Sequence, residues 1–274
     1  MSIRARPPLQ CSVPRFKLTI EYAGTRFSGW QIQKNARTVQ GEIDRAVRQV
    51  TSRTDFELYG SGRTDAGVHA AAQVAHLDVV TSLPADSLRR RVNDELPADI
   101  NILQAEQVPH RFHARHDAVA RRYVYQIARR RTAFHKAYVW WVKERLDASR
   151  MRTAAAALVG LRDFASFAES DDEGKSTRVL VERLDFVEDG DLLLVVVEGS
   201  HFLWKMVRRV VGVLVEVGRG GLEVDAAARY LREDSDVPAR LTAPPSGLFL
   251  ERVRYAGDPA EASVKPLTPL IPNP

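Results

Sequence analysis

Alternation of apolar and polar residues predicts most of the strands in this chain. The first strand is predicted over residues 16–22, where every second residue from Phe16 to Tyr22 is apolar. A near-continuous apolar run at residues 192–197 predicts a strand that is buried on both faces. Similar patterns predict further strands at residues 56–59, 73–79, 100–108, 121–127, 179–186 and from Leu248 onward.

Apolar residues spaced three or four positions apart predict the helices. Thr38 is placed to cap the first helix, and Pro84 suits the first turn of the second. Asp147 is placed to cap a third helix, whose apolar residues follow at helical spacing. The predicted helices cover residues 39–53, 85–96, 148–159, 202–217 and 224–231.

Strands and helices alternate in two portions of similar composition, which predicts an α+β fold. We expect two sheet-plus-helix halves with mostly antiparallel sheets and an active-site cleft between them. The predicted domains are a disordered basic leader at residues 1–14, an N-terminal α+β half at 15–133, a C-terminal α+β half at 134–255 and a proline-rich extended tail at 256–274.

The composition is that of a globular protein with an excess of basic residues. The chain has 274 residues, 45% of them hydrophobic, a net charge of +5 and a pI near 9.5. No apolar run approaches the length of a membrane span, and the first residues lack the apolar core of a secretory signal. The single cysteine, Cys11, excludes an internal disulfide, so a cytoplasmic location is the expectation.

Basic side chains concentrate at residues 111–131. Phe112, Tyr123 and Tyr125 lie among them, and Asp117 is the only acidic residue there. This pattern fits a solvated strand face followed by a basic turn, and equally a phosphate-contacting surface beside a stacking residue. The arginines are Arg111, Arg115, Arg121, Arg122, Arg129, Arg130 and Arg131.

One carboxylate, Asp65, lies in a glycine-rich loop between two predicted strands. Glycine permits positive φ and close approach of another chain segment. Arg63, two residues before Asp65, can favour the ionised carboxylate or bind a phosphate. Most such loops are tight turns in which the aspartate only forms the turn. A carboxylate beside a cation can also act as a nucleophile or a base, and the residues alone leave both interpretations open.

The full string at residues 60–69, Gly-Ser-Gly-Arg-Thr-Asp-Ala-Gly-Val-His, closely resembles the catalytic motif of the tRNA pseudouridine synthase A family, the TruA type. The likeness continues in Tyr-Ala-Gly-Thr-Arg-Phe at 22–27, Phe-His-Ala-Arg at 112–115 and the Gly-Leu pair at 247–248. It therefore covers nearly the whole folded chain.

The resemblance implies roles for individual residues. Asp65 matches the family's catalytic aspartate, and Tyr123 matches a tyrosine that contacts the substrate. Arg208 matches an arginine that enters the active site, and Leu248 a leucine that lines the pocket. Arg63 and Arg208 are expected to keep Asp65 ionised and to bind substrate phosphate.

The implied reaction converts uridine to pseudouridine in tRNA, at positions 38, 39 and 40 of the anticodon stem-loop, by a homodimer. The N-glycosidic bond breaks, the uracil turns, and a C-glycosidic bond forms, so no cofactor and no metal is expected. His110, His113 and His116 recur at every third residue, but in an extended segment they would not share one face. The expected partner is tRNA, with no membrane association.

Two other functions compete with this interpretation. One is a non-catalytic RNA-binding or RNA-chaperone protein on the same fold, against which the intact Arg63-Thr64-Asp65 core argues. The other is a carboxylate-dependent hydrolase of a smaller phosphorylated substrate, against which the long arginine-rich span and the lack of a phosphate-loop sequence argue.

The position of Arg208 leads to a geometric prediction. It lies about 200° around the predicted helix from both Met206 and Val210, and therefore outside the apolar face. That position fits plain solvent exposure. With the family's arginine matched here, it also predicts an ion pair with Asp65 that lowers the pKa of that carboxyl.

Overall fold

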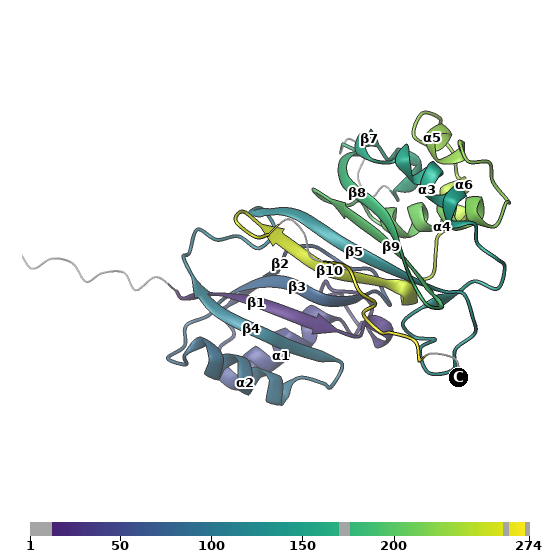
Figure 1. Cartoon of the computed structure of the whole chain (residues 1–274). Coiled ribbons are helices and arrows are strands. Elements are labelled where there is room, and N and C mark those ends of the chain that lie inside the picture. The colour runs from purple at the N-terminus through teal and green to yellow at the C-terminus, as the bar shows by residue number, and fades with distance from the viewer. Residues whose placement is uncertain (1–12, 170–175, 260–262, 272–274) are drawn as a thin grey trace, which may run out of the picture.

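The computed structural model describes residues 13–169, 176–259 and 263–271, and Figure 1 shows the path of the chain. The predicted leader at residues 1–14 lies almost wholly outside the described residues. No helix among the described residues is long and apolar enough to span a bilayer.

Ten strands form one mixed, mostly antiparallel sheet. Eight of them follow the order β4-β1-β3-β10-β5-β9-β8-β7, while β2 pairs with β3 and β6 with β5. Among the strand pairs of the described residues, only β3–β10 and β5–β6 are parallel. The strands are β1 (Arg15–Tyr22), β2 (Glu57–Gly60), β3 (His69–Asp78), β4 (Ile100–Val108), β5 (Ala118–Ala128), β6 (Trp140–Trp141), β7 (Gly160–Asp163), β8 (Arg178–Asp189), β9 (Leu192–Gly199) and β10 (Leu248–Tyr255).

The sheet differs from the expectation of separate sheets in two halves. The last strand, β10, comes from the C-terminal portion but lies between β3 and β5 of the N-terminal portion, and β5 also pairs with β9, so strands of both portions form one sheet. Its pairing with β3 covers only two residue pairs, whereas its pairing with β5 runs along most of the strand. A pattern within one segment shows that it is a strand but not which strands it separates.

The helices gather at the two ends of this sheet. Figure 1 shows α1 and α2 beside the β1–β4 end, and α3 to α6 together at the β7–β9 end. The helices are α1 (Val39–Thr51), α2 (Ala85–Glu95), α3 (Ala148–Ala156), α4 (Met206–Gly218), α5 (Ala226–Tyr230) and α6 (Val237–Arg240), with 3-10 turns η1 (Gly24–Arg26), η2 (Ala165–Phe167) and η3 (Pro245–Gly247).

Local predictions of strands and caps are confirmed. The β1 strand buries every second side chain, as its alternation predicts. Thr38 caps α1 by accepting a hydrogen bond from the amide of Gly41, and Asp147 caps α3 by accepting two amide hydrogen bonds. The strand predicted at residues 179–186 is part of β8, which has a register shift between Val181 and Arg183.

The helix predicted to begin at Phe202 begins four residues later, at Met206. Lys205 has a left-handed backbone, with φ +59, which interrupts the helix before its first turn. The helix is also buried on nearly all sides, not along one stripe, because α3, α5 and α6 surround it. A periodic pattern of apolar residues therefore predicted this helix but not its first residue.

The described part of the proline-rich tail, residues 263–271, packs against β5 and β9. Its apolar side chains contact buried residues such as Val124 and Leu194. The fully buried amide of Gln126 accepts hydrogen bonds from the backbone of Leu267 and Thr268 and donates to the Thr268 hydroxyl. These contacts cover a strand face that would otherwise expose apolar surface.

Candidate active site

The glycine-rich loop at residues 61–68 joins β2 to β3 and carries Asp65. The Ser61 hydroxyl donates to Oε1 of Gln73 on β3 at 2.7 Å, and Nε2 of Gln73 donates to the carbonyl of Gly62 at 3.1 Å. Gln73 is fully buried, so these bonds have no competition from water. They fix the beginning of the loop to the sheet. In the sequence, Gln73 is one polar residue in an alternating strand, and nothing there indicated this role.

The loop that follows β1 supports the middle of the Asp65 loop. The hydroxyls of Thr64 and Tyr22 lie 2.8 Å apart, and the Trp30 amide donates to the carbonyl of Thr64 at 3.1 Å. The amide of Gly67 donates to the carbonyl of Phe27 at 3.2 Å. Backbone groups on both sides of Asp65 are thus held by a second loop.

Two glycines allow the two loops to lie in contact. A Cβ at Gly29 would lie 2.6 Å from the carbonyl oxygen of Thr64, and Gly29 also has a φ of +93. A Cβ at Gly24 would lie 1.9 Å from the carbonyl oxygen of Val68. Any larger residue at either position would separate the loops. The Gly24 amide donates to Nδ1 of His69, whose pKa burial lowers to about 4, so the ring is a neutral acceptor.

Asp65 forms an ion pair with Arg208, which α4 contributes from 143 positions further along the chain. Nη1 of Arg208 donates to Oδ2 of Asp65 at 3.3 Å, and the two side chains are 14% and 20% exposed. Nε of Arg208 donates to the carbonyl of Ala243 at 2.7 Å, which orients the guanidinium. Because Gly212 lacks a side chain, α4 can lie against the carbonyl of Leu241. The predicted ion pair is present in the structure.

The charge of Asp65 reflects two opposing influences. Burial is the larger and raises the pKa of Asp65 above its ordinary value. Arg208 lowers that pKa through its charge and its hydrogen bond, Lys205 lowers it further, and Glu169 raises it. Arg208 therefore acts on the carboxyl in the predicted direction, but burial outweighs it and the net pKa is raised, which the sequence did not indicate.

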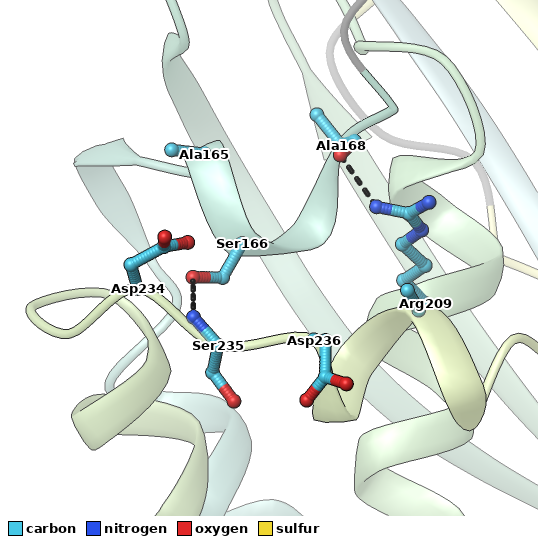
Figure 2. A pocket seen from close by; sticks show the side chains of 8 residues that line it. Ala165, Ser166, Ala168, Arg209, Asp234, Ser235 and Asp236 are labelled. Atoms are coloured by element: carbon cyan, nitrogen blue, oxygen red, sulfur yellow. Dashed lines mark hydrogen bonds between the residues drawn. The ribbon is translucent and has the colours of Figure 1, made fainter.

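A second group of charges lies at the start of α4. Nζ of Lys205 lies 2.6 Å from Oε2 of Glu169, and Nη2 of Arg209 lies 3.1 Å from the same oxygen. Figure 2 shows Arg209 directed toward the carbonyl of Ala168. Both residues line a cavity of about 400 Å³. Asp65 is not among the residues that line this cavity. The charges of Lys205 and Glu169 affect the pKa of Asp65 in opposite directions, and no pattern in the sequence indicated either role.

Tyr123 on β5 is 9% exposed, and its ring meets Phe202 edge to face, with ring centroids 5.3 Å apart. Burial raises the pKa of Tyr123 above its ordinary value, and the charges of Tyr22 and Asp65 add to that rise. The phenol of Tyr123 therefore lies close enough to the Asp65 carboxylate for the charge of Asp65 to affect its pKa. Phe202 precedes α4, so the same connection carries both the ring against Tyr123 and the helix of Arg208.

The other two predicted site residues, Leu248 and Arg63, lie in different surroundings, one buried and one exposed. Leu248 begins β10, is 4% exposed and pairs with Tyr125. Arg63 is exposed, and no ion pair joins it to Asp65 among the described residues. The cation beside Asp65 is therefore Arg208, and the expectation that Arg63 stabilises the carboxylate directly is wrong. Adjacency in sequence did not place the two side chains together, because the loop directs Arg63 to the surface.

The arginine-rich span at residues 111–131 is not one continuous phosphate-binding surface. Arg122 is 2% exposed and lies 2.6 Å from Glu251. Arg129 and Arg130 each lie 2.6 Å from a carboxylate of the β8–β9 hairpin. Several of these arginines thus have acidic partners from distant strands, which the local charge pattern did not reveal.

The histidines of this region pack as rings. The ring centroids of His113 and His116 lie 4.2 Å apart, and His113 also contacts His76 edge to face. In the part of the chain that the structure describes, no group of three or more histidine, cysteine, aspartate or glutamate residues is arranged to hold a metal ion.

Comparison with known proteins gives a consistent result. A family model described as tRNA pseudouridine synthase matches residues 18–117 and 154–256. A protein of Bradyrhizobium sp. named tRNA pseudouridine synthase A is 42% identical over 246 residues, which cover 89% of this chain and 100% of that protein. A protein of Geobacter sp. with the same name is 41% identical over 242 residues, 87% of this chain and 98% of that protein.

The raised pKa of Asp65 predicts that Asp65→Asn increases stability at neutral pH. A carboxyl whose folded pKa is raised contributes stability that is complete below its unfolded pKa, about 3.9, and is lost as the pH rises through the folded pKa. Asparagine is neutral throughout, so the variant should have the larger free energy of unfolding at pH 7, and the difference should disappear toward pH 4. Urea denaturation at both pH values measures this. A variant that is less stable at pH 7 would show that pairing with Arg208 outweighs burial.

Proposed function

The chain belongs to the tRNA pseudouridine synthase family, and we propose that it converts uridine to pseudouridine in tRNA with Asp65 as the essential catalytic group. The observation that carries the proposal is the Asp65–Arg208 ion pair, which joins the glycine-rich loop to a helix far along the chain. Burial disfavours the charged form of this largely buried carboxyl, and carboxyls with such perturbed pKa values, paired with a cation, cluster at functional sites.

The reaction rearranges bonds within one nucleotide. The bond from N1 of uracil to C1′ of the ribose breaks, the base turns, and C5 bonds to C1′. C5 then loses its proton, and N1 gains one. Asp65 acts as an anion in each of its three possible roles: attack on the ring, attack on the sugar, or removal of a sugar proton. Arg208 favours that anion, and Ala243 orients Arg208 toward it.

Other residues around Asp65 have roles in binding. We propose that Tyr123 contacts the target base with its ring, supported by Phe202 behind it. Leu248 contributes apolar surface at the beginning of β10. Arg63, exposed and two residues from Asp65, binds a phosphate of the RNA. A target in a stem must leave its stack, which costs a few kcal/mol, and such contacts offset that cost.

The proposal extends to the substrate position and the assembly that the family resemblance implies. The targets are uridines 38, 39 and 40 of the anticodon stem-loop, and the enzyme acts as a homodimer in the cytoplasm. The N-terminal portion, residues 15–133, supplies Asp65, and the C-terminal portion, residues 134–255, supplies Arg208, with the substrate bound in a cleft between them. The chain-distant origin of the two side chains supports this arrangement.

An unmodified tRNA transcript tests the function directly. The protein is incubated with a transcript that has uridine at positions 38, 39 and 40, without added cofactor, and pseudouridine is then mapped. Wild type should form pseudouridine at these positions. Asp65→Asn should lose at least about 100-fold in rate, roughly 2.7 kcal/mol in barrier, while binding tRNA as wild type does. Binding without pseudouridine at any position would instead support the non-catalytic RNA-binding alternative.

Salt dependence of tRNA binding tests the role of Arg63. Each phosphate contact adds to the slope of log affinity against log salt, so Arg63→Gln should reduce the slope by about 1. Arg129→Gln is the matched control, because Arg129 already lies 2.6 Å from Glu188 and has less charge to offer. Equal slopes for Arg63→Gln and wild type would remove Arg63 from the RNA-contacting residues.

A further inference from the structure

We propose that Arg121 is a positioning residue, which holds the Asp65 loop against the connection that leads to Arg208 and does not itself contact RNA. The inference rests on the proposed function, because it concerns the geometry of that active site. Arg121 lies near the beginning of β5, two residues before Tyr123. The charge pattern of the sequence fits a solvated strand face and a phosphate-contacting surface equally, and the hydrogen bonds of Arg121 in the structure fit neither.

The Arg121 guanidinium donates hydrogen bonds to backbone carbonyls of three segments. Nη2 donates to Ser61 at 2.9 Å and to Arg115 at 2.8 Å. Nη1 donates to Ser200 at 2.7 Å and to Ala118 at 3.2 Å. Ser61 is the first residue of the Asp65 loop, and Ser200 follows β9 at the beginning of the connection to α4. One side chain therefore joins the loop of Asp65 to the segment that carries Arg208.

These bonds use the donors that a phosphate contact would need. A guanidinium has five N–H groups, two on each terminal nitrogen and one on Nε. Each terminal nitrogen of Arg121 already donates to two carbonyls, so only Nε is left. A bidentate contact with a phosphate is thus not available without breaking the bonds to the backbone.

The charge of Arg121 has no acidic partner among the described residues, unlike that of its neighbour. Arg122 lies 2.6 Å from Glu251 and 3.9 Å from Glu198. Burial lowers the pKa of Arg121, so the folded chain bears a desolvation cost at this position. Four carbonyl dipoles solvate the guanidinium in place of water and of a carboxylate. This arrangement keeps a cation beside the active site without neutralising it.

The positions of the residues that Arg121 contacts explain why loss of its side chain would lower the reaction rate. Ser61 lies four residues before Asp65, and Ser200 lies two before Phe202, whose ring supports Tyr123. Release of these carbonyls would let the Asp65 loop and the Phe202 segment move independently. A displacement of about 1 Å in a catalytic geometry can cost about 100-fold in rate. Binding of tRNA, which depends on surface contacts, would change little.

The test compares single-turnover pseudouridine formation and tRNA affinity in wild type and Arg121→Ala. We expect the rate to fall about 100-fold and the Kd to stay within about twofold. Guanidinium ion at tens of millimolar should restore at least tenfold of the lost rate by occupying the vacated site, whereas ammonium ion should not, because it lacks the planar fork. A general loss of structure would give no such rescue. A weakened Kd with an unchanged rate, or no loss of rate, would overturn the proposal.

Arg121→Lys keeps the charge and most of the packing, and covers the case in which the alanine variant does not fold. An ammonium has three N–H donors on a single nitrogen, whereas the two terminal nitrogens of Arg121 direct four donors at these carbonyls. At least one carbonyl therefore loses its donor in the variant, and the rate should still fall. Hydrogen exchange in free protein should become faster at residues 61–68 while β9 stays protected. This readout does not need activity. A wild type that forms no pseudouridine would refute the proposed function, whereas unchanged exchange and rate in Arg121→Lys would refute the role of Arg121.

Discussion

The ion pair between Asp65 and Arg208 opposes the effect of burial on the Asp65 carboxyl, and the rest of the site holds this pair in place. Burial disfavours the charged carboxyl, and Arg208 and Lys205 favour it, so the charge state of Asp65 depends on where α4 lies. The helix is placed by backbone contact: Arg208 bonds to Ala243 through both its Nε and its main chain, and Gly212 leaves room for the carbonyl of Leu241. The electrostatics of one carboxylate therefore rest on close packing between a helix and a loop.

The single sheet holds the Asp65 loop close to the strand that carries Tyr123. Because β10 lies between β3 and β5, the strand that follows the Asp65 loop and the strand that carries Tyr123 are neighbours of the same strand. Gln73 and Arg121 then fix the loop to the sheet, one from β3 and one from β5. Arg121 donates to backbone carbonyls, and the Gln73 amide accepts from the Ser61 hydroxyl and donates to the carbonyl of Gly62. Neither residue needs a charged partner for these bonds. Positioning in this site is mostly a matter of hydrogen bonds to the main chain.

Much of the local structure could be predicted from the sequence, while the residues that assemble the site could not. Alternation predicted β1, a near-continuous apolar run predicted β9, and the capping residues Thr38 and Asp147 predicted two helix starts, because these signals are local. The arginines of β5 were interpreted as a possible phosphate-binding surface, since their partners come from distant strands. The family resemblance predicted the ion pair of Asp65 with Arg208, and the structure showed that Arg63 does not join it.

In the free protein, Arg208 lowers the pKa of Asp65 and so favours its ionised form. Titration of side-chain carboxyl carbons by NMR tests it, with Asp65 assigned from the Asp65→Asn spectrum. We expect a pKa for Asp65 above the ordinary value of about 3.9 in wild type, because burial raises it. The pKa should be higher still in Arg208→Met, because the opposing charge of Arg208 is removed. Asp86, whose pKa Arg89 lowers, should titrate alike in both proteins and serves as an internal control. An Asp65 pKa that is unchanged or lower in Arg208→Met would show that Arg208 does not favour the ionised carboxyl.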